Sequence, residues 1–196
     1  MNSKNVATGR PNVGGAIFTA PKGTAVPKSA QELLDQSVFI ELGYASEEGI
    51  TNSVETETNQ VNAWGGDEVL NEVVSRSETF SFTLIETSAE TLKEVYGEDN
   101  VTVDSDGTAV LHNARSLPER VHVYEILMGQ GQVKRIVVPR VKTTELGDVV
   151  YNGSDPIGYE LTLAALPDAD GNTAYEYLAD IDSSDELPQL DGADDE

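Results

Sequence analysis

The sequence contains no cysteine, which excludes disulfide frameworks, cysteine-ligated zinc and thiol catalysis. Basic residues are also scarce: Lys and Arg together number 12, against 35 Asp and Glu, and the formal net charge is -23. Proteins bind nucleic acid largely through Lys and Arg that displace counterions, so direct binding to phosphates is not expected. No apolar run approaches the ~18 residues of a membrane span and no signal-peptide pattern is present, so we expect a soluble protein made in the cytoplasm.

The acidic residues are concentrated where basic ones are missing. Residues 29–75 carry ten carboxylates and no Lys or Arg, yet the stretch alternates as strands do. Like charges packed on one folded face repel each other and destabilise the compact state. An acidic surface that is retained despite this cost usually has a function: it either repels a partner or pairs with one.

Residues 50–75 are predicted to form a long β-hairpin. Thr, Val and Asn alternate with acids on both sides of Gly65-Gly66, and Trp64 lies beside this predicted turn. The strands are poor in Leu and Phe, so neither face resembles the core of a monomer. A hairpin that cannot bury a face within its own chain tends to bury it against a neighbouring subunit.

Strand patterns dominate the rest of the chain. Residues 79–84 alternate strictly and place Phe80, Phe82 and Leu84 on an inward face. Further strands are predicted at 38–44, 101–103, 108–112, 121–128, 133–142, 149–151, 157–166 and 175–178. These short strands favour a mainly β fold, a β-sandwich or barrel, with one helix on its flank.

Two segments have the spacing of a helical capping box. Residues 29–32 predict a short helical turn, and residues 87–90 predict the start of the one longer helix. The apolar stripe of that helix begins at Leu92, and Gly97 supplies its C-terminal stop.

The length of 196 residues and the apolar content of 38% predict one domain with appendages. We place this domain at residues 13–178, with the hairpin inside it. Residues 1–12 are expected to be a flexible arm, and residues 179–196 a disordered acidic tail.

Several motifs resemble ligand sites but are better explained as turns or packing. The Asp-rich tetrapeptides at 104–107 and 168–171 lack the acid that begins a calcium loop, so turn chemistry is favoured. The segment 129–132 lacks the third Gly of a phosphate loop and precedes a strand pattern. His112 and His122 lie in apolar strand contexts and are predicted to be packed. We therefore predict no catalytic residue, metal or cofactor, and an enzyme is disfavoured.

Four of the basic residues gather in one strand region: Lys134, Arg135, Arg140 and Lys142. One interpretation is a solvated edge, and Pro139 supports an edge or a bulge because it cannot donate to a strand ladder. The other is that this region meets an acidic face of another copy, which a chain this acidic needs for self-association. Two interpretations likewise remain for Trp64: it anchors an interface, or it packs locally within the chain.

Several short strings occur in an order and spacing that make them specific together, although none is specific alone. They are Val13-Gly-Gly-Ala-Ile-Phe-Thr-Ala-Pro, Leu42-Gly-Tyr-Ala-Ser-Glu-Glu-Gly-Ile, Ala63-Trp-Gly-Gly-Asp, Phe80-Ser-Phe-Thr-Leu-Ile-Glu, Val95-Tyr-Gly-Glu-Asp-Asn-Val, Lys134-Arg-Ile-Val-Val-Pro, Gly158-Tyr-Glu-Leu-Thr-Leu-Ala-Ala-Leu-Pro-Asp and Gly171-Asn-Thr. In this order they resemble the major tail tube protein of long, non-contractile-tailed bacteriophages. The resemblance covers residues 4–178.

The resemblance implies a structural virion protein. It implies a β-sandwich with a flanking helix that assembles into hexameric rings, in which each subunit lends strands to a continuous inner β-barrel. The rings would stack into a hollow tube around the tape-measure protein, with tail terminator and distal tail proteins at its ends. The genome would then pass through the lumen without specific binding.

The resemblance and the strand alternation together predict the functional surfaces. The carboxylates predicted to line the lumen and repel DNA phosphates are Glu55, Glu57, Asp67, Glu68 and Glu72. Alternation prevents all five from facing the same way. The residues predicted to contact other subunits are Trp64, Lys134, Arg135, Arg140, Lys142, Arg10, Lys22 and Lys28. The positive segment 1–28 is expected to dock on the next ring, so that its deletion blocks polymerisation and leaves the monomer folded.

Two other classes of protein remain as alternatives. One is a β-sandwich binding or adhesion module, which would expose aromatic clusters, whereas the aromatic residues here are 6% of the chain and scattered. The other is a tube protein of the type VI secretion kind, whose architecture is similar to that of the tail tube family.

Overall fold

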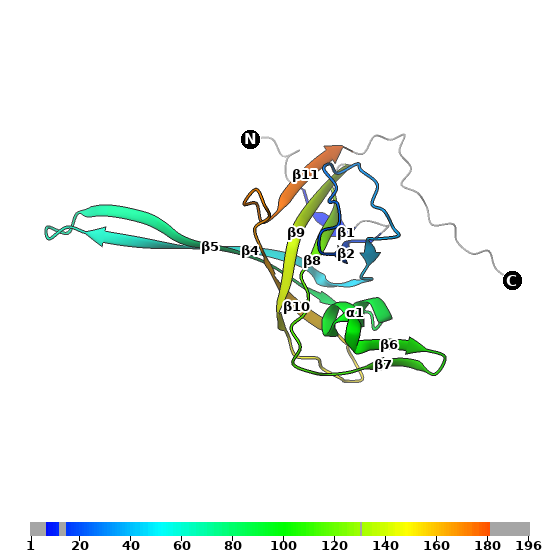
Figure 1. Ribbon diagram of the computed structural model, residues 1–196. Coiled ribbons are helices and arrows are strands. Elements are labelled where there is room, and N and C mark those ends of the chain that lie inside the picture. Colours follow the sequence, from blue (N-terminus) through cyan, green and yellow to red (C-terminus); the bar gives the residue numbers. More distant parts are fainter. Residues whose placement is uncertain (1–6, 12–14, 130, 181–196) are drawn as a thin grey trace.

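The computed structural model describes residues 7–11, 15–129 and 131–180 (Figure 1). Its strands are β1 (Gly9–Pro11), β2 (Ile17–Pro21), β3 (Ile40–Glu41), β4 (Ala45–Asn62), β5 (Glu68–Leu84), β6 (Val101–Asp104), β7 (Gly107–Val110), β8 (Arg120–Met128), β9 (Gln132–Leu146), β10 (Tyr159–Ala165) and β11 (Tyr175–Asp180). Among the described residues one α-helix, α1 (Ala89–Tyr96), precedes a 3-10 turn, η2 (Glu98–Asn100). The predicted mainly β fold with one flanking helix is confirmed.

The large sheet is antiparallel and has nine strands in the order β3-β2-β8-β9-β10-β5-β4, with β1 added to β8 and β11 to β9. Strand β9 lies at its centre: residues 132–137 pair with β11 and residues 141–146 pair with β10, while β8 runs along the opposite edge of β9. Pro139 falls where the β8–β9 register shifts. The prediction of a bulge at Pro139 is therefore confirmed, whereas the prediction of an edge strand there is wrong.

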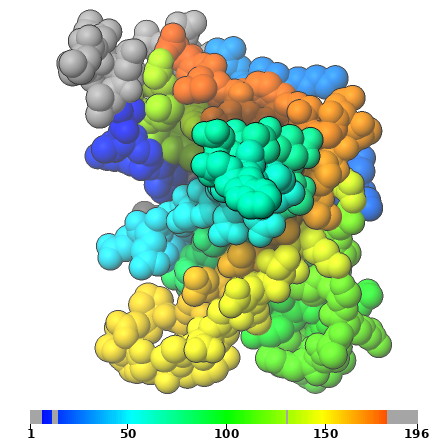
Figure 2. Space-filling view, turned by 90° about the vertical axis from the view of Figure 1, so that its left-hand side faces the viewer, coloured from blue at the N-terminus to red at the C-terminus, as the bar shows by residue number. Residues whose placement is uncertain are grey.

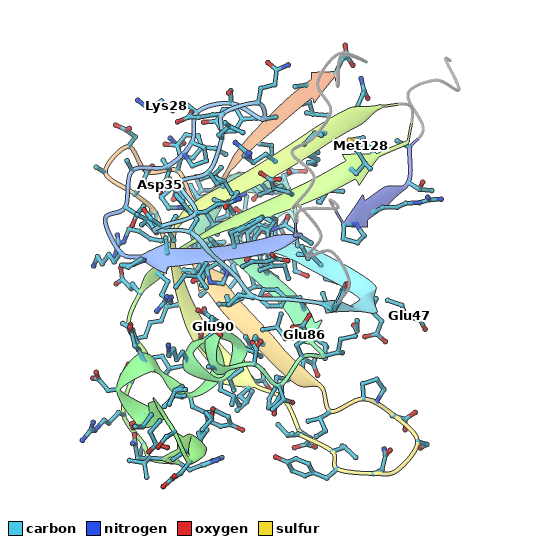
Figure 3. The ribbon with its side chains drawn as sticks, turned by 90° about the vertical axis from the view of Figure 1, so that its right-hand side faces the viewer. Lys28, Asp35, Glu47, Glu86, Glu90 and Met128 are labelled. Carbon is cyan, nitrogen blue, oxygen red and sulfur yellow. The ribbon has the colours of Figure 1, made fainter. Side chains whose placement is uncertain are left out.

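The main core lies where β5, β8 and β10 meet under α1. Phe80, Phe82 and Leu84 are all buried, as their alternation predicts. The ring of Phe80 stacks on that of Tyr124 with centroids 5.2 Å apart. Each such side chain stabilises the fold by about 1.5–3 kcal/mol when it is fully buried. A smaller apolar cluster lies beneath the segment that carries Lys28 and Asp35 (Figure 3).

Helix α1 begins one residue later than the capping box at 87–90 predicts. Ser88 is the N-cap, and its hydroxyl accepts a hydrogen bond from the Thr91 N–H at 3.1 Å. At the other end Gly97 has φ 94° and donates its N–H to the Lys93 carbonyl. The predicted glycine stop is confirmed, because a left-handed conformation of this kind favours a residue without Cβ.

Three of the predicted local elements are wrong. The strand predicted at 38–44 is reduced to β3, because the N–H groups of Val38 and Phe39 both bond to the Asp35 carbonyl and hold the chain in a turn. Residues 29–32 form bends rather than a helical turn. The predicted strand at 149–151 is absent, since the Asn152 side chain accepts N–H bonds from the two residues after Gly153 and forms a local turn.

The N-terminal segment belongs to the sheet. Strand β2 pairs with β3 and β8, and Ile17 and Ala20 are completely buried. Deleting residues 1–28 would remove this core strand, so the prediction that the deletion leaves the monomer folded is wrong. Within the predicted arm, β1 pairs with β8. Residues 1–6 and 12 of the arm, and residues 181–196 of the predicted tail, lie outside the described residues, whereas residues 179–180 form the end of β11.

Candidate functional site

The hairpin formed by β4 and β5 projects far from the rest of the protein (Figure 1). Its strands are 18 and 17 residues long and pair from Ala45 with Leu84 to Asn62 with Glu68. Every residue from 51 to 77 is exposed. In Figure 2, which looks along the hairpin, it stands out in front of the surface around it. The base of the hairpin packs in the core, and the rest of its length is exposed.

The projecting part of the hairpin offers both apolar side chains and open strand edges. Strand β4 ends the sheet, and β5 pairs with β10 only over residues 79–84. Beyond that point both hairpin edges carry unpaired backbone groups, which are templates for another chain. The exposed apolar side chains along it are Val54, Val61, Trp64, Val69, Leu70, Val73 and Val74. This combination is typical of a surface that is completed by another molecule.

Strand register divides the hairpin into two faces. One face continues the core: Asn52 pairs with Phe80, which pairs with Leu163. The opposite face continues across β5, β10 and β9 as a surface of small hydroxyl side chains. We call it the hydroxyl face, and it contains Thr51, Ser53, Ser75, Ser77, Thr79, Ser81, Thr83 and Thr162.

The register sorts the five carboxylates that were predicted to line a lumen. Glu55, Glu57 and Glu72 lie on the hydroxyl face, opposite Ser77, Ser75 and Asn59 respectively. Glu68 lies on the other face, where it accepts hydrogen bonds from Gln60 and Asn71. Asp67 lies in the turn, and its carbonyl accepts the N–H of Ala63. The predicted division of these acids between two faces is confirmed.

The hydroxyl face carries two further acids that the sequence alone does not predict there. Glu160 of β10 pairs with Thr83, and Glu145 of β9 pairs with Thr162. Lys142, which pairs with Ala164, lies on the same face. Alternation within β9 and β10 gives the side of each strand on which these residues lie. It does not reveal that β9 and β10 lie next to β5.

The sequence decides to which family this protein belongs. A family model described as phage tail tube protein matches residues 2–186. The chain belongs to the phage tail tube protein family. The resemblance of its ordered strings is thereby confirmed, and this tail tube protein is a structural component of the virion.

Solved structures that are similar to the tail tube protein share little sequence with it. The tube-terminating cap of an anti-feeding prophage is 9% identical, with 91% of this chain and 99% of that chain covered and a TM-score of 0.41. A chain of the native gene transfer agent virion is 13% identical, with 87% and 99% covered and a TM-score of 0.40. A chain of the sheath–tube complex of an extracellular contractile injection system is 9% identical, with 88% and 93% covered and a TM-score of 0.38. Comparison with curated protein sequences gives no match.

A hydrogen-bonded clamp at the base of the hairpin fixes it to the body of the tail tube protein. Glu78 of β5 is buried, and its carboxylate accepts bonds from Asn52, Arg76 and Thr173. Arg76 also donates to Thr173, on the segment before β11. Burial raises the pKa of Glu78, but the bonds from Thr173 and Asn52 and the charge of Arg76 outweigh it and lower that pKa overall.

Replacing Glu78 with Ala is expected to loosen the hairpin at its base. The change leaves three donors without their acceptor, and it should lower the free energy of unfolding by about 1–3 kcal/mol. Urea unfolding measures the loss, and hydrogen exchange should rise over residues 45–57 and 75–84. Glu55→Ala is the matched control on the exposed part, where we expect a change within about 0.5 kcal/mol. Equal effects of the two substitutions would contradict the clamp.

The structure contradicts one predicted subunit contact. Arg135 is buried within its own chain. Its guanidinium pairs with Glu125, the cross-strand neighbour on β8, and donates to the carbonyls of Ser29 and Glu32. A guanidinium whose donors are satisfied within the chain is not available to a second copy, so the prediction for Arg135 is wrong.

Other basic residues predicted at an interface have carboxylate partners in the same chain. Lys134 lies 2.8 Å from Glu176. Arg140 and Lys22 share Glu119 at 3.0 and 2.9 Å, and their hydrogen bonds, that of Arg140 first, lower the pKa of Glu119 to about 2. Arg10, Lys28 and Lys142 are exposed. The side chains that can still meet a neighbour are thus fewer than the sequence predicts.

The two histidines differ from each other. His122 is buried, as predicted, and its Nε2 donates to Glu94 of α1 at 2.9 Å. Arg120 and Thr19 donate to the other oxygen of the same carboxylate. His112, predicted to be packed in a strand, is instead exposed beyond the end of β7, with its ring 4.5 Å from that of Tyr96. The sequence does not reveal that α1 brings Glu94 to His122.

Within residues 7–11, 15–129 and 131–180, no group of three or more His, Asp and Glu side chains is arranged to hold a metal ion. In the same part of the chain, no helix has the length and apolarity needed to cross a membrane.

Proposed function

We propose that this tail tube protein assembles with copies of itself into hexameric rings, which stack into the hollow tube of the tail. The observation that carries the proposal is the projecting hairpin, whose residues 51–77 are wholly exposed. A ribbon of two strands is marginal in water unless it packs against more structure. Neighbouring copies supply that structure when the strand edges join into a closed barrel, which leaves no open edge.

The hydroxyl face lines the bore of the proposed tube. It carries the carboxylates of Glu55, Glu57, Glu72, Glu145 and Glu160, against one base, Lys142. Small hydroxyl side chains between the acids leave a hydrated wall near the base of the hairpin, and Val61 and Leu70 join this face towards its tip. Carboxylates repel DNA phosphates, and the repulsion is strong in a narrow channel because the protein walls focus the field. The tube thus conducts the genome without binding it.

The resemblance to the tail tube family supplies the other proposed partners. Before the genome passes, the tape-measure protein occupies the bore, and tail terminator and distal tail proteins close the two ends of the tube. Trp64 and the exposed bases Arg10 and Lys28 contact neighbouring copies, whereas Lys142, which was predicted at the same contacts, lies on the face that lines the bore. Synthesis in the host cytoplasm precedes incorporation into the virion.

A cryo-electron microscopy map of the purified protein after polymerisation tests the proposal. We expect tubes of uniform bore with six copies per ring, and with Glu55, Glu57 and Glu72 facing the channel. A map that places most of these carboxylates in subunit contacts with Lys or Arg would contradict the proposed lining. Monomers that do not assemble at any concentration tested would contradict the tube itself, and would favour a binding module.

A further inference from the structure

A hollow of about 240 Å³ opens beside the C-terminal end of α1. It is lined by Val95 and Tyr96 of α1, by Leu146 at the end of β9, and by residues of the segment 111–117. The volume is below the ~300–1,000 Å³ typical of small-molecule sites. Its size and its largely apolar lining suit a single large side chain.

The side chain that would gain most from being covered by such a hollow is that of Trp64. It lies at the tip of the hairpin and is 105% exposed. A Trp side chain buries about 150–250 Å² when it is covered, so an uncovered Trp is a strong candidate anchor. The hairpin leaves the body on the side away from α1 (Figure 1), so Trp64 cannot reach the hollow of its own chain.

We propose that Trp64 of one copy inserts into the α1 hollow of a second copy. This rests on the proposed self-assembly and adds the two surfaces that meet. The indole packs on Leu111, Leu117 and Leu146, and it lies against the paired rings of Tyr96 and His112. Both ring types favour edge or offset contacts with an aromatic partner.

Charge at the rim favours the same partner. Arg115 is exposed beside the hollow, and its guanidinium has no hydrogen-bond or ion-pair partner among the described residues. A guanidinium can stack on an indole face. Asp67, which follows the Trp64 turn directly, brings a carboxylate of opposite charge to the same rim.

The chain has one Trp, so its fluorescence reports on Trp64 alone. In monomers the emission should be red-shifted and readily quenched by acrylamide, as for a solvated indole. In tubes the emission should shift to the blue, and the quenching constant should fall severalfold. Tubes in which Trp64 stays as accessible as in the monomer would overturn the inference while leaving the proposed tube intact. A failure to form tubes would instead count against the proposed function.

Two exposed leucines provide a matched pair of variants. Leu111 lies at the hollow and is 64% exposed, and Leu33 lies elsewhere and is 83% exposed, so Asp at either position should leave the monomer folded. We expect Leu111→Asp to raise the protein concentration needed for assembly roughly 30-fold, the effect of losing a hot-spot contact. Leu33→Asp should leave that concentration unchanged. Equal behaviour of the two variants would overturn the inference.

A photo-crosslinking amino acid in place of Trp64 identifies the occupied surface directly. We expect crosslinks between copies in assembled tubes, at residues 95–117 or at Leu146. Crosslinks that map instead to another surface, or a crosslink of residues 181–196 to the hollow when a second probe is placed in that segment, would overturn the assignment of Trp64 as occupant.

Discussion

Replacing residues 58–74 with Asn-Gly is expected to abolish tube formation and leave the monomer folded. Glu57 and Ser75 are directly paired, so a two-residue turn can join them without changing the register below. All removed residues are exposed, and the clamp at Glu78 is retained. The free energy of unfolding should therefore change by no more than about 1 kcal/mol. Sedimentation and electron microscopy measure assembly, and urea unfolding measures the stability of the monomer.

A charge-only variant separates the two properties that the truncation removes. Glu55→Gln, Glu57→Gln and Glu72→Gln together neutralise the acids of the hairpin's hydroxyl face and keep all its exposed apolar side chains. This triple variant should still polymerise, because contacts between copies depend on the strand edges and the apolar groups. Tubes of normal length from the truncated protein would show that the hairpin is not the element that joins subunits.

The elements that the sequence predicted well are those with a local signal. Strict alternation over 79–84 identifies a core strand, and Gly65-Gly66 marks the turn of the long hairpin. Gly97 ends the helix because its φ of 94° favours glycine. Each of these signals depends on residues that are close together in the sequence, so it can be recognised without knowledge of the fold.

The surfaces that the sequence predicted poorly depend on strands that are distant in the chain. In the sequence Arg135 has no evident acidic partner, but the β8–β9 register places it beside Glu125, with which it forms an ion pair. Glu145 and Glu160 join the acids of the hairpin only because β10 pairs with both β5 and β9. The composition gives the number of charged residues, but strand pairing across the sheet determines which of them remain available to a partner.

Replacing Glu94 with Ala is expected to destabilise the monomer more than any other single substitution proposed for this protein. Its carboxylate is buried and joins α1 to the sheet through His122 at 2.9 Å and Arg120 at 3.1 Å. Removing one member of a buried ionic group leaves the others uncompensated and lowers stability by about 3–5 kcal/mol. Urea unfolding at neutral pH measures this loss. Glu90→Ala on the same helix is the matched control, because its half-buried pair with Lys93 at 3.8 Å should contribute less than about 0.5 kcal/mol.

The pH dependence of the Glu94 effect distinguishes an ionic role from simple packing. Burial raises the pKa of Glu94, but the contacts with His122 and Arg120 and the bond from Thr19 lower it below its ordinary value of 4.5. A carboxyl whose pKa is lower in the folded state stabilises the fold above its unfolded pKa, and this stabilisation is lost as the pH falls through the folded pKa. The stability gap between the natural protein and Glu94→Gln should therefore narrow on acidification below 4.5. A gap that stays constant across this range would mean that Glu94 acts through its shape, and that the ionised carboxylate is not what holds α1 against the sheet.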